Sequence, residues 1–269
     1  MATTQKWVLL NIDGVPLDPS DAQKLVDALN EDNGECGPFA QATGRSASVR
    51  LGASSDDRQV DEYAMNIRHS IPEAPGALAY HYVTNGVPDI ELGWDLFDGV
   101  IDGPDPFSVG VDHELKEALR DPGANGWKDG VNSNGKASAD EACDKVQNTF
   151  RKASNGVTLS NFLLESAFIP GAAAPYDALG VMTSQDDLSN GYDIEADVEN
   201  VTQVHSDADT DGSRALIAIE KHATKRKVTM RNATNLTPKQ LKRKTHPWSR
   251  AHRRGFRHFH ESASEGGEV

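Results

Sequence analysis

The chain has 269 residues, of which 37% are hydrophobic, and a mean hydropathy of −0.56, which is enough for a hydrophobic core in one large domain or two modest ones. No apolar run approaches the ~20 residues that span a bilayer, and the first ten residues are typical of a strand rather than of a signal peptide, so we expect no membrane association. The net charge of −14 is unevenly distributed: residues 221–269 hold thirteen Lys or Arg and three Glu, a net charge of +10, which leaves −24 on residues 1–220.

This charge asymmetry indicates an acidic body, residues 1–220, followed by a basic arm, residues 221–269. The body by itself repels nucleic acid and anionic membranes. The two cysteines are too few for a disulfide scaffold or a zinc knuckle. A single Cys36–Cys143 bridge stays open at this point.

The first ninety residues alternate between predicted strands and helices. Short apolar runs bounded by turn residues predict strands at 7–12, 46–51, 77–83 and 87–92. Helical spacing of apolar residues predicts one helix that starts at Asp18-Pro19 and ends at Gly34, and a second over 56–68. Asn85-Gly86 favours a tight hairpin between the last two strands. The expected order is therefore β-α-β-α-β with a hairpin.

A loop rich in Gly, Pro and Asp separates this half from a predicted helix over 107–120, which Asp121-Pro122-Gly123 ends. The chain beyond it is loop-rich, with a short predicted helix over 139–146 and an apolar stretch over 157–169. Residues 207–212 begin like an EF-hand loop, but Ala218 stands where the loop needs a bidentate Glu, so an acidic turn is the better interpretation. Together these elements predict an α+β fold.

The 107–120 helix contains the pattern His113-Glu114-x-x-Glu117. His113 and Glu117 are four residues apart and share one face of the helix, and Asp121 falls one turn further along the same stripe. In a metalloprotease helix of this kind His113 would supply a nitrogen ligand and Glu117 an oxygen ligand, while Glu114 would accept a proton from a metal-bound water. The common zincin motif has a second His in place of Glu117, so this harder ligand set admits calcium or manganese as well as zinc.

Two alternatives remain open for these residues. The same spacing fits a surface helix on which Glu114, Lys116, Glu117 and Arg120 form solvated pairs. His81, on the preceding strand, is either a fourth metal ligand or a packed, hydrogen-bonded strand histidine.

Further residues flank this motif on both sides. Together with it they form an ordered set between positions 75 and 195. They are Ala79-Tyr80-His81, His113-Glu114-x-x-Glu117, Asp121-Pro122, Trp127, Glu141-Ala-Cys143-Asp144, Ser160-Asn161-Phe162, Phe168, Pro175-Tyr176-Asp177, Leu179-Gly180 and Gly191-Tyr192. This ordered set resembles a family of tailed-bacteriophage proteins that are usually encoded among virion structural genes, and it is distantly similar to the exordium-type secreted proteins of plants.

The resemblance implies a zincin-like mixed sheet with a metal-site helix, a loop-rich C-terminal half and a metal site completed by Glu141 or Asp144. The cofactor would be a divalent metal (zinc, calcium or manganese), unless the site has lost it. Two residues depart from the family pattern: Asp112 replaces the Ser before the His, and Lys145 replaces a Pro. Asp112 would add negative charge beside the ligands, which favours a harder cation or a degenerate site. The family implies no particular reaction.

We therefore expect a structural component of a tailed-phage virion, such as a capsid-decorating, vertex, neck or tail protein, present in the virion and, during assembly, in the host cytoplasm. Its expected partners are major capsid or neck and tail subunits and further copies of itself, reached through the basic arm. One alternative is an active metallopeptidase with Glu114 as general base, although we expect its peptidase activity to be weak or absent. Another is nucleic-acid binding through residues 221–260, where Trp248, Phe256 and Phe259 alternate with basic clusters. A solvated, disordered tail is the third alternative for this segment.

Overall fold

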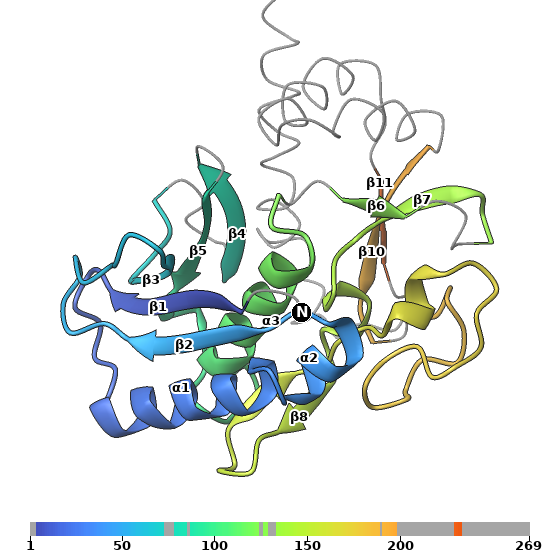
Figure 1. Cartoon of the computed structure of the whole chain (residues 1–269). Helices are drawn as coiled ribbons and strands as arrows, with labels where there is room; N and C mark the ends of the chain where they lie inside the picture. Colours follow the sequence, from blue (N-terminus) through green and yellow to red (C-terminus); the bar gives the residue numbers. More distant parts are fainter. Residues whose placement is uncertain are drawn as a thin grey trace, which may run out of the picture.

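A mixed five-stranded sheet, covered on one face by helices, forms the larger part of the computed structural model (Figure 1). The structure describes residues 4–72, 78–84, 87–123, 126–128, 133–188, 190–197 and 229–232. The sheet has the order β2-β1-β3-β5-β4. Its strands are β1 (Gln5–Asn11), β2 (Ala47–Leu51), β3 (Tyr63–Arg68), β4 (Ala79–Thr84) and β5 (Val87–Gly93). All pairings are parallel except that of the edge strand β4 with β5.

The alternation of side chains along β1 explains why helices cover one face of this sheet. Trp7 and Leu9 are buried in the main core together with residues of the helices, whereas Val8 and Leu10 lie in a smaller cluster with Ala64. Three helices are described: α1 (Pro19–Asn33), α2 (Pro38–Thr43) and α3 (Phe107–Arg120). Helix α1 begins where the Asp18 carboxylate accepts hydrogen bonds from the backbone N–H groups of Ser20 and Asp21.

Helix α3 lies inside the molecule. All of its residues except Val109 are buried. It packs against β4 and β5 on one side and against β9 (Thr158–Ser160) on the other. The Ser108 hydroxyl donates to the carbonyl oxygen of Thr158 at 2.6 Å, and the backbone N–H of Ser160 donates to the Asp112 carboxylate at 2.9 Å. The surface-helix alternative is therefore wrong, because this helix has no solvated face.

Ion pairs make the burial of such a polar helix feasible, since a buried charge needs a hydrogen-bonded partner. Lys116 pairs with Asp32, near the end of α1, at 2.7 Å and with Asp112. Arg120 pairs with Asp140 and with Glu165. The basic residues of α3 thus connect it to α1 and to the segment that follows.

The C-terminal half is built from short strands and turns. A second sheet has the order β11-β10-β7-β6, and a separate hairpin pairs β8 with β9. The remaining elements are the strands β6 (Trp127–Lys128), β7 (Lys136–Ala139), β8 (Phe150–Lys152), β10 (Tyr192–Asp197) and β11 (Thr229–Asn232), and the 3-10 turns η1 (Trp94–Leu96), η2 (Asp144–Val146) and η3 (Glu165–Phe168). Figure 1 shows α3 between the two larger sheets. The loop-rich character predicted for this half agrees with these short elements.

The expected α+β class is correct, but three details of the predicted order are wrong. The second predicted helix, over 56–68, is instead a turn-rich segment followed by β3, which pairs with β1 and β5. Val60, which the helical pattern placed on an apolar face, is fully exposed. The short helix α2 was not predicted. Of the helix predicted over 139–146, only the turn η2 is present, and Ala139 is the last residue of strand β7.

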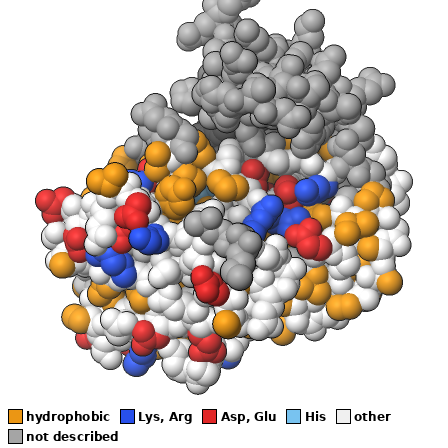
Figure 2. Space-filling view, in the orientation of Figure 1, with side chains coloured by type: hydrophobic (Ala, Val, Ile, Leu, Met, Phe, Trp, Pro, Cys, Tyr) orange, Lys and Arg blue, Asp and Glu red, His pale blue; other side chains and the backbone are white. Residues whose placement is uncertain are grey.

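Charged side chains of both signs lie side by side in several places on the face of the molecule in Figure 2. Exposed ion pairs such as Lys6–Asp61, 2.5 Å apart, contribute to such mixing. Cys36 is exposed and Cys143 is buried, and both are free, so the bridge that the sequence left open does not form. Within the part of the chain that the structure describes, none of the helices has the length and apolar character needed to cross a membrane.

Most of the predicted basic arm, and the EF-hand-like residues 207–212, lie outside the described residues. The exception is β11, four residues inside the predicted arm, which pairs antiparallel with β10 of the body. The boundary at residue 220 stays a prediction.

Candidate metal centre

His113 and Glu117, the two ligands predicted from the helix motif, lie together in the interior. The His113 Nε2 and Glu117 Oε1 atoms are 3.0 Å apart, and His113 Nε2 is 3.4 Å from Asp144 Oδ1 in η2. The three side chains are at most 3% exposed. Of Glu141 and Asp144, the two carboxylates expected to complete the site, Asp144 is thus the one that approaches His113.

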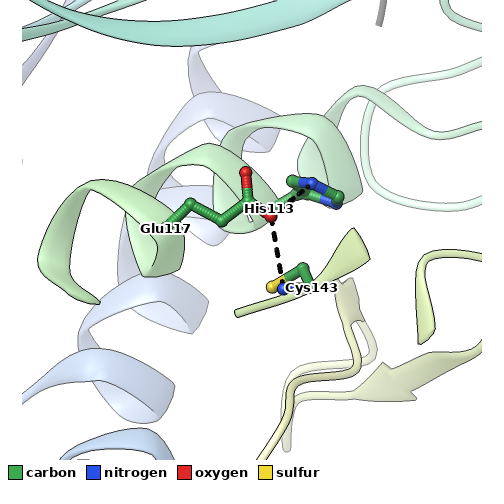
Figure 3. A group of neighbouring side chains, drawn as sticks. All are labelled: His113, Glu117 and Cys143. Carbon is green, nitrogen blue, oxygen red and sulfur yellow. Dashed lines mark hydrogen bonds and ion pairs between the residues drawn. The ribbon is translucent and has the colours of Figure 1, made fainter. Parts of the chain in front are cut away.

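Cys143, next to Asp144, belongs to the same site (Figure 3). The possible ligand atoms of His113, Glu117 and Cys143 all lie within 4.8 Å of one another. The backbone N–H of Cys143 also donates to Glu117 Oε1 at 3.2 Å, which fixes that oxygen on the side of His113. Sequence reasoning assigned Cys143 no ligand role, because the two cysteines raised only the question of a disulfide.

A second group of ligand atoms lies on the other side of Glu117. His81, Glu114 and Glu117 offer atoms within 4.8 Å of one another, and all three side chains are fully buried. His81 Nδ1 is 3.0 Å from Glu114 Oε2 and 4.0 Å from Glu117 Oε2. His81 pairs in register with Ile90, whose side chain is in the core shared with α3, so strand alternation directs the imidazole towards the helix.

Three other residues that the sequence associated with the site have different surroundings. Glu141 is buried but belongs to neither group of ligand atoms. Asp121 Oδ2 accepts a hydrogen bond from the backbone N–H of Gly126 at 2.5 Å. Its backbone has left the helical conformation (φ −128°, ψ 77°), so the predicted continuation of the helical stripe fails there.

Asp112 also differs from the expectation that it adds uncompensated charge beside the ligands. Its carboxylate pairs with Lys116 and accepts hydrogen bonds from the Asn33 amide at 2.9 Å and from the backbone of Ser160. These contacts place the carboxylate against the end of α1 and β9. Asp112 therefore does not favour a harder cation or a degenerate site, and that expectation is wrong.

The electrostatics of the site reflect carboxylates held out of water. Burial disfavours the charged form of His113, but Glu117, Asp144 and Glu114 outweigh it and raise the pKa of His113 to about 10. Burial, and then Asp144 and Glu117, raise the pKa of the Tyr192 hydroxyl well above its usual 10.0. Burial, and then Glu117, likewise raise the pKa of the Cys143 thiol well above 9.0. Tyr192 is a site residue to which the sequence assigned no role, although its Gly-Tyr pair is part of the family pattern.

The residues fit a divalent cation. Imidazole nitrogens and carboxylate oxygens bind zinc at about 2.0–2.2 Å, so two ligands of one ion lie roughly 3 to 3.5 Å apart. The separations of His113 Nε2 from Glu117 Oε1 and Asp144 Oδ1 match that spacing. In addition, Glu114 Oε1 is buried and has no hydrogen-bond partner among the described residues. These groups of residues could therefore hold a metal ion.

Comparison of the chain with family models, curated proteins and solved structures found no match. The geometry of this site and the resemblance of the sequence motifs are therefore the two indications of function.

Proposed function

We propose that this chain is a non-enzymatic structural component of a tailed-phage particle, with a zincin-like body stabilised by a buried divalent cation and a basic arm that docks on neighbouring subunits. The ordered motifs between residues 75 and 195 and the charge difference between body and arm support the virion role. The capsid, vertex, neck or tail are all compatible positions.

The observation that favours a structural site over a catalytic one is the environment of Glu114. A general base must reach a metal-bound water and the substrate. Glu114 is fully buried, and its Oε2 atom is 3.0 Å from His81 Nδ1. A catalytic zinc keeps an open position for water, whereas a structural zinc is enclosed by its ligands. The burial of His113, Glu117 and Asp144 supports a site of the second type.

His113, Glu117 and Asp144 would hold the cation, with Cys143 as a further candidate ligand. A cation bound there neutralises buried carboxylates and connects α3 to η2. The nitrogen and sulfur atoms favour zinc, whereas the carboxylates are equally compatible with manganese. Calcium is a weaker candidate, because it prefers six to eight oxygen ligands.

An active metallopeptidase is the second candidate, and two observations favour it. The antiparallel edge strand β4 runs beside α3, as the edge strand does above the site of metalloproteases. Glu114 also retains an oxygen atom that has no hydrogen-bond partner in the described part of the chain.

One experiment separates the two candidates. The full chain is purified, stripped with a chelator and loaded with Zn²⁺ or Mn²⁺, and casein cleavage and thermal unfolding are then measured. We expect no cleavage and a higher melting temperature with the metal, since a ligand that binds only the folded state stabilises it. Casein cleavage that Glu114→Gln abolishes would establish the peptidase instead. A melting temperature unaffected by metal would contradict the structural cation.

The virion role has its own test. Quantitative mass spectrometry of purified particles should find this chain at a fixed copy number. Its absence from particles that are otherwise complete would contradict the role, whatever the result with metal.

A further inference from the structure

The two oxygen atoms of Glu117 face different histidines. Oε1 is 3.0 Å from His113 Nε2 and accepts the backbone hydrogen bond of Cys143, whereas Oε2 is the oxygen that faces His81, 4.0 Å from its Nδ1 atom. The same carboxylate therefore belongs to both groups of ligand atoms, the one with His113 and Cys143 and the one with His81 and Glu114.

From this arrangement we propose that Glu117 bridges two divalent cations. The first is the structural cation of the proposed function, held on the side of His113 and Asp144. The second is held by His81 and Glu114, two residues to which the proposed function assigns no cation. A carboxylate that binds one ion through each oxygen is compatible with the separation of about 3.5–4 Å found in two-metal sites. The inference rests on the proposed first cation.

The charges in this part of the core support a second cation. Glu114, Glu117 and Asp144 are three buried carboxylates that lie against two histidines. Among the basic side chains nearby, Lys116 pairs with Asp32 and Asp112, Arg120 with Asp140 and Glu165, and Lys145 with Asp193. Buried charges require compensation, and two divalent ions supply it at the positions where the carboxylates converge.

Glu114 gives the independent sign that a ligand is involved. A hydrogen bond between His81 and Glu114 accounts for the Oε2 atom of the carboxylate. It does not account for Oε1, which is fully buried and has no hydrogen-bond partner among the described residues. A packed strand histidine would need only the first contact. A cation bound by His81, Glu114 and Glu117 uses the second oxygen as well, so the alternative in which His81 is a ligand fits this carboxylate better.

The test is metal stoichiometry. The chelator-stripped full chain is dialysed against Mn²⁺ and, separately, Zn²⁺, and the bound metal is measured by inductively coupled plasma mass spectrometry. Electron paramagnetic resonance of the Mn²⁺ form reports whether two ions are close enough to be magnetically coupled. The variants are His81→Gln and Glu114→Gln, which keep side chains of similar size. His69→Gln is the matched control, because His69 Nδ1 also lies 3.0 Å from a carboxylate, that of Asp95, but at the surface.

We expect about two ions per chain and a coupled spectrum for the natural sequence and for His69→Gln. Both site variants should bind about one ion and give the spectrum of isolated Mn²⁺. One ion in the natural sequence would overturn the two-cation proposal. If His81→Gln retains that ion, the structural cation stays in place; if His81→Gln removes it, the single ion lies on the His81 side and the structural cation is overturned as well. No bound metal in a folded chain would overturn both. Circular dichroism of each variant shows whether a loss of metal comes from misfolding. If a variant misfolds, the spectrum of the natural sequence alone decides the proposal: a coupled spectrum supports two adjacent cations, and an uncoupled one contradicts them.

Discussion

Lys116 is the residue on which the burial of α3 depends most directly. Its side chain is fully buried and its Nζ atom lies between the carboxylates of Asp32 and Asp112. Burial opposes the ammonium charge, but the two carboxylates outweigh it and raise the pKa of Lys116 above its usual value. The side chain is therefore charged in the folded protein.

Lys116→Met should lower the free energy of unfolding by about 3–5 kcal/mol, because it leaves the buried Asp112 carboxylate without its cation and leaves Asp32 with Arg151 alone. Urea unfolding followed by circular dichroism measures this loss. Lys24→Met is the control, since Lys24 pairs with Asp21 at 3.1 Å on the surface, where such pairs contribute about 1 kcal/mol or less. Equal losses in the two variants would show that the buried pairs are no more important than a surface pair.

Glu62 gives the protein a predictable response to acid. Its carboxylate accepts hydrogen bonds from Arg50 at 2.6 and 2.7 Å, which outweigh burial and lower the pKa of Glu62 below its usual 4.5. A lowered folded-state pKa means that the stabilisation is complete above about pH 4.5 and is lost as the pH falls through the folded-state value.

Glu62→Gln should therefore reduce stability at neutral pH and flatten the decline of stability below pH ~4.5. Urea unfolding over a series of acidic pH values measures the slope. Arg50→Gln should flatten the slope as well, because Arg50 causes the shift. An unchanged slope in both variants would exclude this pair as an origin of acid sensitivity.

At the scale of single residues, the sequence predicted what local geometry controls. The four-residue spacing of a helix placed His113 beside Glu117. The approach of Asp144, the role of Cys143 and the choice between the two roles of His81 depend on how separate segments pack, which spacing does not determine. Asp121 illustrates the same limit, because its predicted position assumed that the helix continues through residue 121, whereas the helix ends at Arg120.

Among the elements, η2 packs closely against the start of β10. A Cβ atom on Gly191 would lie 1.9 Å from the carbonyl oxygen of Asp144 and 2.2 Å from the carbonyl carbon of Lys145. These are backbone atoms, so no side-chain movement could relieve the contact. The lack of a side chain at Gly191 allows η2, and with it Asp144, to pack against the start of β10.

Gly191→Ala should displace η2, destabilise the protein and weaken binding of the first cation. Isothermal titration with Zn²⁺ and thermal unfolding measure the two effects. Gly171→Ala is the control: its φ of 73° costs a non-glycine residue roughly 1–2 kcal/mol, but the space around it is open and the metal site does not include it. Wild-type zinc affinity in Gly191→Ala would show that Asp144 does not depend on this contact.

The elements that the sequence predicted correctly carried their own boundary signals. Helix α1 has Asp18 and Pro19 at its start and Gly34 after its end, and α3 is bounded by Pro106 and Asp121-Pro122. Strand β3 was mistaken for a helix because Val60, Tyr63, Ala64 and Ile67 fit helical spacing. Its pairing with β1 and β5 makes this segment a strand, and a local sequence pattern cannot reveal such long-range pairing.

For the whole molecule, β11 refines where an arm can be separated from the body. Residues 229–232 pair with β10 at positions 192–195, and Tyr192 lies in the candidate metal centre. Residues beyond 232 carry eight Lys or Arg and three Glu, a net charge of +5. A cut after residue 232 therefore removes basic charge and leaves the second sheet complete.

Deletion of residues 233–269 should preserve the melting temperature of the body but weaken the proposed binding to particles, because it removes half of the net charge of +10 on residues 221–269. Deletion of residues 221–269 should also lower the melting temperature, because β11 is removed. Thermal unfolding and co-sedimentation with particles at rising salt measure both effects. Full incorporation of the 233–269 deletion would show that residues 233–269 are dispensable.

The enclosed position of α3 has a consequence for how the molecule exchanges hydrogen with solvent. Amide protons on the exposed side of a helix are commonly released by local fraying, but α3 has buried residues around its whole circumference and ion pairs to α1 and to Asp140 and Glu165. Its amides can reach deuterium only when the surrounding layers separate, so their protection equals the global stability. We therefore expect the helix that carries the candidate metal ligands to be among the slowest-exchanging of the described elements, so that its exchange would report on how strongly a bound cation stabilises the entire fold.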